Sequence, residues 1–155
     1  MKKTFKILFC ILIPLIVGGV SGYFTTTNIA TWYVTLIKPS FNPPNYLFGP
    51  VWTTLYILMG ISLFIVLNKA KEFDKKKIIV VFSLQLILNF LWSFIFFEFH
   101  QLGLACIEIV LMWFSILYMI IVFYKTNKWA AYINIPYLLW VSFASVLTFT
   151  ICFLN

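Results

Sequence analysis

The sequence predicts an all-α integral membrane protein, built as a bundle of five transmembrane helices with one long first loop. Hydrophobic residues make up 63% of the 155 positions and charged residues only 10%, which leaves too little polar surface to cover a water-soluble globule. The apolar runs are continuous rather than alternating. They therefore favour helices, which satisfy their own backbone hydrogen bonds, over the strands of a β-barrel.

Five runs are long enough to cross a hydrocarbon core of roughly 30 Å, which requires about 20 helical residues. They cover residues 7–24, 47–67, 78–97, 102–124 and 129–154, and together they form one membrane domain over residues 1–155. The first run also has the basic start and apolar centre of a cleaved secretory signal. Its length, and the bulky Tyr23 and Phe24 where a signal has small residues, favour a retained helix.

The positions of the lysines predict the orientation, because every basic residue of the chain is a lysine. Lysines lie before the first run and after the second and fourth, at positions Lys2, Lys3, Lys6, Lys69, Lys71, Lys75, Lys76, Lys77, Lys125 and Lys128. Only Lys38 falls on the opposite side. The positive-inside rule then places the N-terminus inside and the C-terminus outside, in a bacterial cytoplasmic membrane. The net charge of +7 is thus a topological signal with an attraction to membrane lipid, and no nucleic-acid partner is expected.

Motifs of conventional enzymes are absent from the sequence. Cys10, Cys106 and Cys152 all fall within apolar runs without metal-type spacing, which indicates packing residues and no metal site. His100 lies in a short turn, where a solvated imidazole is expected. The chain has no P-loop, dinucleotide fingerprint or Ser/His/Asp set, which sets aside a conventional hydrolase or kinase.

The first loop, predicted over residues 25–46, is the one long connection, and loops longer than about 12–15 residues in a compact fold are usually functional. Pro39, Pro43 and Pro44 prevent a regular helix throughout. The loop and its border carry the aromatic residues Trp32, Tyr33, Phe41, Tyr46 and Phe48. These favour a structured lid over the mouth of the bundle; the alternative is an aromatic belt at the membrane interface.

Polar residues inside the runs are costly in hydrocarbon unless they face a cavity or a partner. Gln85, Asn89 and Trp92 have the spacing i, i+4, i+7, which places them on one inward stripe. Hydrogen bonds between helices are the alternative role, and the favoured one for Gln85. Glu108 is a proton or ligand site, or else its carboxylate is hydrated or hydrogen-bonded to the first loop.

Tryptophans occur in three different runs at related depths. Trp52 begins the second run and is followed at helical spacing by Tyr56, whereas Trp140 shares a stripe of the fifth run with Tyr137 and Ala144. Core packing is the ordinary role of such stripes. Because Trp52, Trp92 and Trp140 all fall toward the first-loop side, they could instead line one cavity beneath the lid, and Ala144 would leave room for a flat ligand.

Four runs of sequence resemble the tryptophan-rich sensory protein (TspO)/translocator protein family, also called the peripheral-type benzodiazepine receptor or TspO/MBR family. They are GGVSG, WYVTLIKPSFNPPNYLFGPVWTTLY, QLILNFLWSFIFF and PYLLWVSFA, and the resemblance covers the whole chain. It implies a five-helix membrane receptor or sensor, often a homodimer, whose pocket is closed by the first loop. It further implies binding of tetrapyrroles, chiefly protoporphyrin IX and haem, and of isoquinoline carboxamides and benzodiazepines, with roles in tetrapyrrole metabolism and stress response. No cofactor is required.

The resemblance also implies site residues. By matching motifs, the pocket would contain Trp32, Tyr33, Pro43, Leu47, Phe48, Trp52, Tyr56, Asn89, Trp92, Cys106, Ile109, Trp140, Phe143 and Ala144. Some bacterial members break down protoporphyrin IX in light and oxygen, and the tryptophans implicated in that reaction correspond to Trp52 and Trp140. A tryptophan radical that passes oxidation to the macrocycle would need no acid–base pair.

The chain departs from the animal branch at two places. Leu104 stands where animal members have a pocket tryptophan, which predicts a wider pocket there. No basic residue follows Lys128, so the cholesterol-recognition motif is missing. Two other functions stay open: a transporter of porphyrins or other small apolar molecules, and a regulatory partner protein that uses Gly18 and Gly22, at GxxxG spacing, for helix contact.

Overall fold

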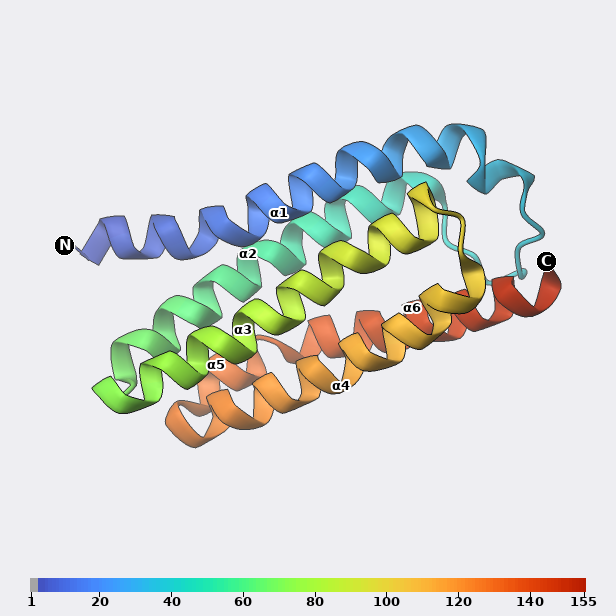
Figure 1. Ribbon diagram of the computed structural model, residues 1–155. Helices are drawn as coiled ribbons and strands as arrows, with labels where there is room; N and C mark the ends of the chain where they lie inside the picture. The colour runs from blue at the N-terminus through green and yellow to red at the C-terminus, as the bar shows by residue number, and fades with distance from the viewer. Residues whose placement is uncertain (1–2) are drawn as a thin grey trace.

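The computed structural model describes residues 3–155, and within them the chain is helical without a β-strand (Figure 1). The elements are α1 (Lys3–Thr31), the 3₁₀ turn η1 (Tyr33–Thr35), α2 (Asn45–Lys69), α3 (Glu72–Ser93), the π-helical turn η2 (Phe94–Glu98), α4 (Leu102–Thr126), α5 (Lys128–Tyr132) and α6 (Ile135–Leu154). Five segments are long and apolar enough to cross a membrane: Lys3–Thr31, Asn45–Lys69, Glu72–Glu98, Leu102–Thr126 and Lys128–Leu154. The predicted five-helix membrane bundle is confirmed.

Helix α1 continues to Thr31, whereas the sequence predicted its end at residue 24. The added turns are rich in threonine, which ordinarily favours helix ends. Here the hydroxyls donate to carbonyls four residues earlier, from Thr26 to Gly22 at 2.7 Å and from Thr31 to Thr27 at 3.1 Å. These bonds satisfy the threonine side chains within the helix. The irregular segment is therefore shorter than expected and covers residues 32–44, which we call loop one.

The fifth span is interrupted between α5 and α6, where the sequence predicted one continuous helix. Pro136 lies in the first turn of α6, and its ring cannot follow a regular helical turn because it clashes with the carbonyl four residues earlier. The buried Asn134 amide fills the break by donating to the carbonyl of Ala130 at 2.9 Å and to the Ser62 hydroxyl of α2. Side chains thus replace the interrupted backbone bonds.

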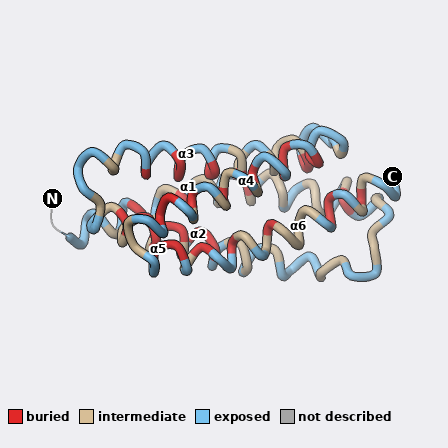
Figure 2. The backbone as a smooth tube through the Cα atoms, turned by 90° about the horizontal axis from the view of Figure 1, so that it is seen from below, coloured by how far each residue is buried: buried red, intermediate tan, exposed pale blue. Residues whose placement is uncertain are grey.

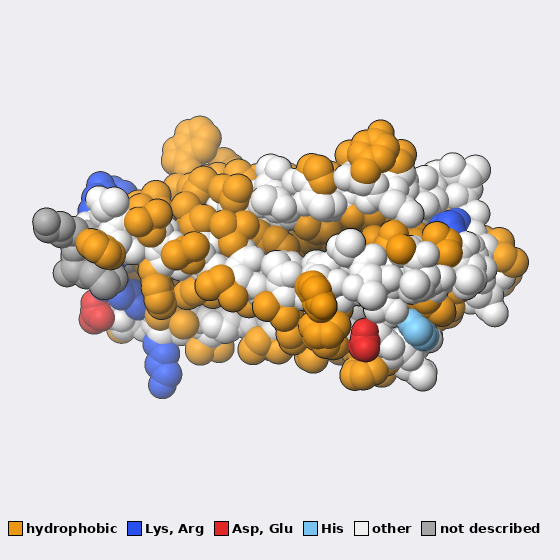
Figure 3. All heavy atoms as spheres, turned by 90° about the horizontal axis from the view of Figure 1, so that it is seen from above, with side chains coloured by type: hydrophobic (Ala, Val, Ile, Leu, Met, Phe, Trp, Pro, Cys, Tyr) orange, Lys and Arg blue, Asp and Glu red, His pale blue; other side chains and the backbone are white. Residues whose placement is uncertain are grey.

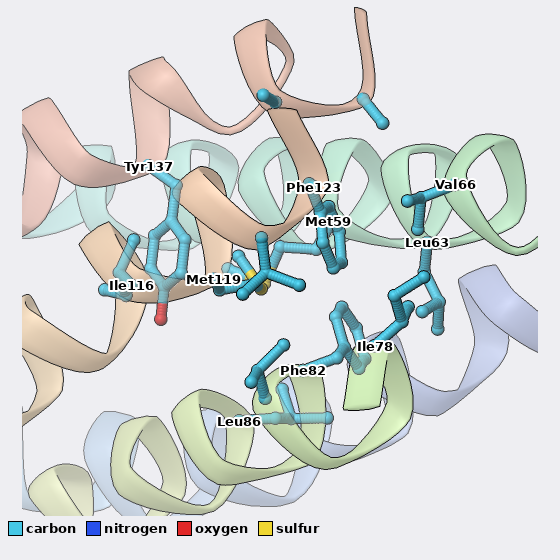
Figure 4. Packing of buried hydrophobic residues seen from close by; sticks show 14 of the residues in the cluster. Met59, Leu63, Val66, Ile78, Phe82, Leu86, Ile116, Met119, Phe123 and Tyr137 are labelled. Atoms are coloured by element: carbon cyan, nitrogen blue, oxygen red, sulfur yellow. The ribbon is translucent and has the colours of Figure 1, made fainter. Parts of the chain in front are cut away.

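The larger of the two buried hydrophobic clusters draws side chains from α1, α2, α3, α4 and the fifth span. Figure 4 shows part of this cluster pointing into one interior, and the labelled side chains are all buried: Met59, Leu63, Val66, Ile78, Phe82, Leu86, Ile116, Met119, Phe123 and Tyr137. Figure 2 shows the same division along the whole bundle, with buried residues inside and exposed residues on the outer faces. Those outer faces are apolar because they contact lipid.

Helix α1 lies against α2 through two glycines. A Cβ at Gly60 would lie 2.5 Å from the Cα of Ile11, and a Cβ at Gly18 would lie 2.1 Å from Cε2 of the Tyr56 ring. Small residues allow this close approach of helices in a membrane, where dispersion contacts drive helix association.

Loop one has a defined structure, held largely by its own side chains. The ammonium of Lys38 donates to the carbonyls of Tyr33 at 2.8 Å and Leu36 at 2.9 Å, and it lies 5.0 Å from the centre of the Tyr33 ring. The Tyr33 hydroxyl donates to Oδ1 of Asn42 at 2.6 Å. These contacts replace the backbone ladder that the prolines prevent.

The last residue of the chain anchors loop one to α6. The Asn155 side chain accepts from the backbone N–H of Ile37 at 2.9 Å and donates to its carbonyl at 3.0 Å. A side-chain amide that pairs with both the N–H and the carbonyl of one residue fixes the position of that residue's backbone.

Charged residues divide between the two ends of the bundle. In the described chain, the lysines other than Lys38 lie at the end that holds the N-terminus and the α2–α3 and α4–α5 connections, which Figure 3 shows in blue. Lys2, part of the predicted cytoplasmic group, lies outside the described residues. The opposite end, which we call the loop-one end, carries Lys38, Glu98 and His100. The uneven distribution is the one that the positive-inside rule uses.

Candidate functional site: an aromatic cavity beneath loop one

A cavity of about 630 Å³ lies at the loop-one end between α1, α2, α3 with η2, and α6. Its size falls within the range of small-molecule sites. The lining residues are mostly apolar or aromatic, with hydroxyls from α1 and α2: Leu15, Gly18, Gly19, Ser21, Gly22, Thr25, Thr26, Ile29, Ala30, Tyr33, Asn45, Tyr46, Phe48, Gly49, Trp52, Thr53, Tyr56, Trp92, Ser93, Phe96, Phe97, Trp140, Ala144, Leu147, Thr148 and Ile151. We call it the aromatic cavity.

Three helices each contribute one tryptophan to the lining. Trp52 of α2 stacks on Tyr56 with ring centres 5.7 Å apart, and Trp92 of α3 stacks on Phe96 at 5.1 Å. Trp140 of α6 meets Phe48 edge-on at 6.3 Å. Each indole is held by a second aromatic ring, so the three present fixed surfaces to the cavity.

The indole N–H groups of Trp92 and Trp140 are buried and find no acceptor in residues 3–155. A buried donor is normally hydrogen-bonded, because an unmet one costs about 1–3 kcal/mol. Both rings line the cavity, but the two nitrogen atoms themselves are enclosed by protein atoms. The donors reach a bound molecule only if an indole ring turns toward the cavity.

A hydrogen-bonded triad from three helices lies at one wall of the cavity and extends behind it. The hydroxyl of Tyr56 donates to Oδ1 of Asn89 at 2.6 Å, and Nδ2 of Asn89 donates to the hydroxyl of Tyr137 at 3.0 Å. All three residues are buried, but only Tyr56 lines the cavity. Asn89 thus acts behind the wall, where it fixes the orientation of the Tyr56 ring.

The π-helical turn η2 brings two consecutive phenylalanines into the wall. The N–H of Phe99 donates to the carbonyl of Phe94 at 2.8 Å, five residues back, which widens the turn. Phe96 and Phe97 are both buried and both line the cavity. Single π turns inside α-helices often occur at functional sites.

Seven of the predicted site residues line the aromatic cavity: Tyr33, Phe48, Trp52, Tyr56, Trp92, Trp140 and Ala144. The other seven lie outside the lining: Trp32, Pro43, Leu47, Asn89, Cys106, Ile109 and Phe143. Among these, Phe143 packs behind the wall against Trp140 at 5.5 Å. Ile109 is fully buried in the core, and the thiol of Cys106 contacts the Thr148 carbonyl at 3.9 Å.

The structure also bears on four residues discussed from the sequence alone. Leu104 is 51% exposed on the outer face of α4, so it does not set the width of the cavity. The amide of Gln85 is buried without a partner among the described residues, so its predicted bond between helices is missing there. The carboxylate of Glu108 is likewise buried without a partner, which removes the alternatives of hydration and of a bond to the first loop. His100 is exposed as predicted, and its ring also stacks on Trp32 with centres 4.1 Å apart.

Sequence reasoning missed the contributions of α1 and η2 to the wall. The glycines of GGVSG and the threonines that follow are small, and the same signal predicts helix contact, as Gly18 indeed makes with Tyr56. Their positions next to a cavity depend on where α2 lies. Phe96 and Phe97 belong to a continuous aromatic run without helical periodicity, which hides the turn that directs both inward.

The fold and the cavity define a polytopic α-helical membrane protein with an aromatic small-molecule site capped by a structured loop. The sequence pattern of the TspO/MBR family matches residues 10–154, and the chain belongs to that family. This confirms the resemblance predicted from the sequence. Membership supports a role as a membrane sensor or receptor.

Relatives from different domains of life cover most of the chain. It is 41% identical to the tryptophan-rich protein TspO of Chlorobaculum tepidum over 155 residues, which cover 99% of this chain and 98% of that protein. It is 38% identical to the protein of the same name from Archaeoglobus fulgidus over 150 residues, or 97% of each chain. It is 34% identical to the human translocator protein over 122 residues, 77% of this chain and 72% of the relative.

Proposed function

We propose that the protein is a membrane receptor or sensor that binds tetrapyrroles, such as protoporphyrin IX and haem, in the aromatic cavity. The observation that carries this proposal is the convergence of Trp52, Trp92 and Trp140 on one cavity of about 630 Å³. A flat macrocycle gains about 0.5–1.5 kcal/mol from each aromatic contact beyond its area burial. Isoquinoline carboxamides and benzodiazepines, which carry apolar aromatic rings, would use the same walls.

The two unpartnered indole donors support ligands that carry oxygen acceptors. Trp92 and Trp140 each hold a buried indole N–H without an acceptor in residues 3–155. Binding would turn the ring so that a carboxylate or carbonyl of the ligand accepts from it, and a hydrogen bond to a charged group contributes about 1.5–3 kcal/mol. The aromatic walls would thus favour a flat ligand, and the indole N–H groups would favour a ligand with a hydrogen-bond acceptor at the edge of its ring.

We further propose that bound protoporphyrin IX is degraded in light, with Trp52 and Trp140 as electron donors. Light excites the porphyrin, and molecular oxygen is the oxidant. An indole gives one electron to the excited porphyrin, which passes an electron to oxygen and forms superoxide. The tryptophan radical then recovers an electron from the macrocycle, which is left oxidised by one electron. This sequence uses no acid–base pair.

The test is a titration of detergent-purified protein with protoporphyrin IX in the dark, followed by tryptophan quenching, and then illumination with the Soret band recorded over time. The double variant Trp52→Phe/Trp140→Phe should keep saturable binding but lose the porphyrin more slowly in light. Trp129→Phe is the matched control, because Trp129 is 72% exposed and far from the cavity lining. Equal bleaching in the double variant would refute the photochemical role, and absent saturation would refute binding.

The lysine distribution supports a cytoplasmic N-terminus in a bacterial membrane. That orientation and the homodimer stay predictions. A cysteine introduced at Asn155 should react with an impermeant maleimide in intact cells if the loop-one end faces outward.

A further inference from the structure

We propose that the ligand enters the aromatic cavity sideways from the bilayer, through an opening between α1 and α2, while loop one stays closed. The inference rests on the proposed function, because it concerns the route of a molecule into the cavity. In this arrangement loop one is a fixed cover over the cavity. The facing edges of α1 and α2 form the entrance.

The cavity reaches the protein surface between α1 and α2. Its lining includes exposed residues on both helices, namely Gly19, Thr26 and Ala30 of α1 and Tyr46, Gly49 and Thr53 of α2. By contrast, the lining residues Tyr33 and Tyr56 of the interior are buried. A continuous path of lining residues therefore joins the buried walls to the outer surface at this pair of helices.

The same two helices that touch near Gly18 and Gly60 leave space nearer to loop one. A Cβ added at Gly19, Gly22 or Gly49 would meet nothing within 4 Å in the described part of the chain. At Gly18 the added atom would instead lie 2.1 Å from the Tyr56 ring. Positions 18 and 19 lie about 100° apart around α1, so the contrast shows that the side of the helix at Gly18 contacts α2, whereas the side at Gly19 faces open space.

The rim of the opening suits an apolar molecule. The Thr26 hydroxyl donates to the carbonyl of Gly22 at 2.7 Å, and the Thr53 hydroxyl donates to that of Gly49 at 2.9 Å, so their donors are already used. The exposed lining residues Ala30 of α1 and Tyr46 of α2 add apolar and aromatic surface to the rim. Figure 3 looks onto the face that carries α1, where orange side chains are visible between bands of white atoms in the half that holds loop one.

The opening begins at the depth of the hydrocarbon. The lining glycines Gly19 and Gly22 fall within the apolar run of residues 7–24, and the lining continues to Ala30 near the end of α1. At 1.5 Å per residue, the stretch from Leu15 to Ala30 extends about 22 Å toward the loop-one end. A porphyrin dissolved in the bilayer would meet the opening without passing through water.

A route through loop one would require several contacts to break together. The Asn155–Ile37 pair, the Tyr33–Asn42 hydrogen bond and the Lys38 bonds to loop carbonyls all hold the cover in place. Phe41 of the loop also packs against Phe143 of α6 at 6.4 Å. The lateral route disturbs none of them.

The experiment measures rates of protoporphyrin IX binding in the dark by stopped-flow tryptophan quenching. The protein is reconstituted in phosphatidylethanolamine/phosphatidylglycerol vesicles. Porphyrin is either already present in these vesicles or is delivered by mixing them with a second set of vesicles that contain it. The portal variants are Gly22→Phe and Thr53→Phe, one from each helix. The matched control is Val20→Phe, an exposed position of α1 outside the lining, and Asn155→Ala loosens the cover.

We expect both portal variants to slow association and dissociation alike by at least about tenfold, because a narrowed route obstructs entry and exit together, whereas lost wall contacts would speed dissociation. Val20→Phe and Asn155→Ala should stay within about twofold of the parent. Unchanged rates in the portal variants, or faster binding in Asn155→Ala alone, would overturn the lateral route.

Two further outcomes separate this inference from the proposed function. If the parent protein shows no saturable quenching, the proposed function fails, and the lateral route fails with it. If phenylalanine abolishes binding, the graded variants Gly22→Ala and Gly22→Val supply the rates, which must fall as side-chain volume rises. Rates that are independent of volume in these variants would refute the route while the binding function stands.

Discussion

Gly18 of α1 lies against the ring of Tyr56 of α2, so closely that a Cβ at position 18 would be 2.1 Å from Cε2. The same ring stacks on Trp52, and its hydroxyl donates to Asn89. Gly18 of the first helix thus helps to fix the position of the Tyr56 ring in the wall of the aromatic cavity. Its neighbour Gly19 faces open space, so the two adjacent glycines differ in what they contact.

Gly18→Ala should destabilise the protein relative to Gly19→Ala. Both substitutions favour the helix by up to about 1 kcal/mol, but only the first forces Tyr56 or α1 to move, at a cost of about 1–3 kcal/mol. Thermal unfolding in detergent without ligand compares the two. Equal midpoints would mean that the Tyr56 ring shifts at no cost.

Asn89→Leu should destabilise the bundle by about 1–3 kcal/mol for each tyrosine hydroxyl left buried without a partner. The hydroxyls at risk are those of Tyr56 and Tyr137. Combining Asn89→Leu with Tyr56→Phe and Tyr137→Phe should recover part of the loss, because no polar group then lacks a partner. Reversible unfolding in mixed micelles measures all of these variants; a triple variant no more stable than Asn89→Leu would contradict the role of the triad.

Asn155→Ala should release loop one at Ile37. The Ile37 N–H would lose its acceptor, and its hydrogen exchange should accelerate by about three- to tenfold, which corresponds to one ordinary hydrogen bond. Exchange followed by mass spectrometry or NMR tests this. The Ala70 N–H, bonded to Val66 at the other end of the bundle, provides the internal control.

Tyr33 should make stability depend on pH in the alkaline range. Burial raises the pKa of its phenol to about 12, above the value near 10 of an unfolded tyrosine. The neutral phenol therefore contributes stability that is complete below pH 10 and is lost as the pH rises toward 12. The stability difference between the parent and Tyr33→Phe should narrow over that window. A tyrosinate absorbance titration should show one late-ionising group that the variant lacks.

The membrane bundle could be predicted from the sequence, because a continuous apolar run in lipid satisfies its backbone hydrogen bonds by forming a helix. It did not locate the end of α1, since the hydroxyls of Thr26 and Thr31 bond within the helix and extend it. The break before α6 was also missed. Pro136 disfavours a continuous helix, but the side chain that completes the break, Asn134, acts through Ser62 of a distant helix.

The candidate site was partly predictable for a related reason. Trp52, Trp92 and Trp140 were placed at similar depths by position along their runs, and all three line the aromatic cavity. The wall from α1 was not foreseeable, because Gly18 and Gly19 carry the same signal and differ only in what α2 places beside them. Asn89 was correctly assigned to an inward-facing stripe, but its partners are Tyr56, which lines the cavity, and Tyr137, which lies behind the lining.

The larger buried hydrophobic cluster lies mostly toward the lysine-rich end of the bundle. The aromatic cavity lies at the other end, beneath loop one. Substitutions of large core residues such as Met119 or Phe123 therefore lower the free energy of unfolding, whereas substitutions around the cavity first change the shape of the cavity. This division lets ligand preference diverge among related chains while the free energy that keeps the helices together is largely preserved. Ligand choice and foldability can then change at different rates during evolution.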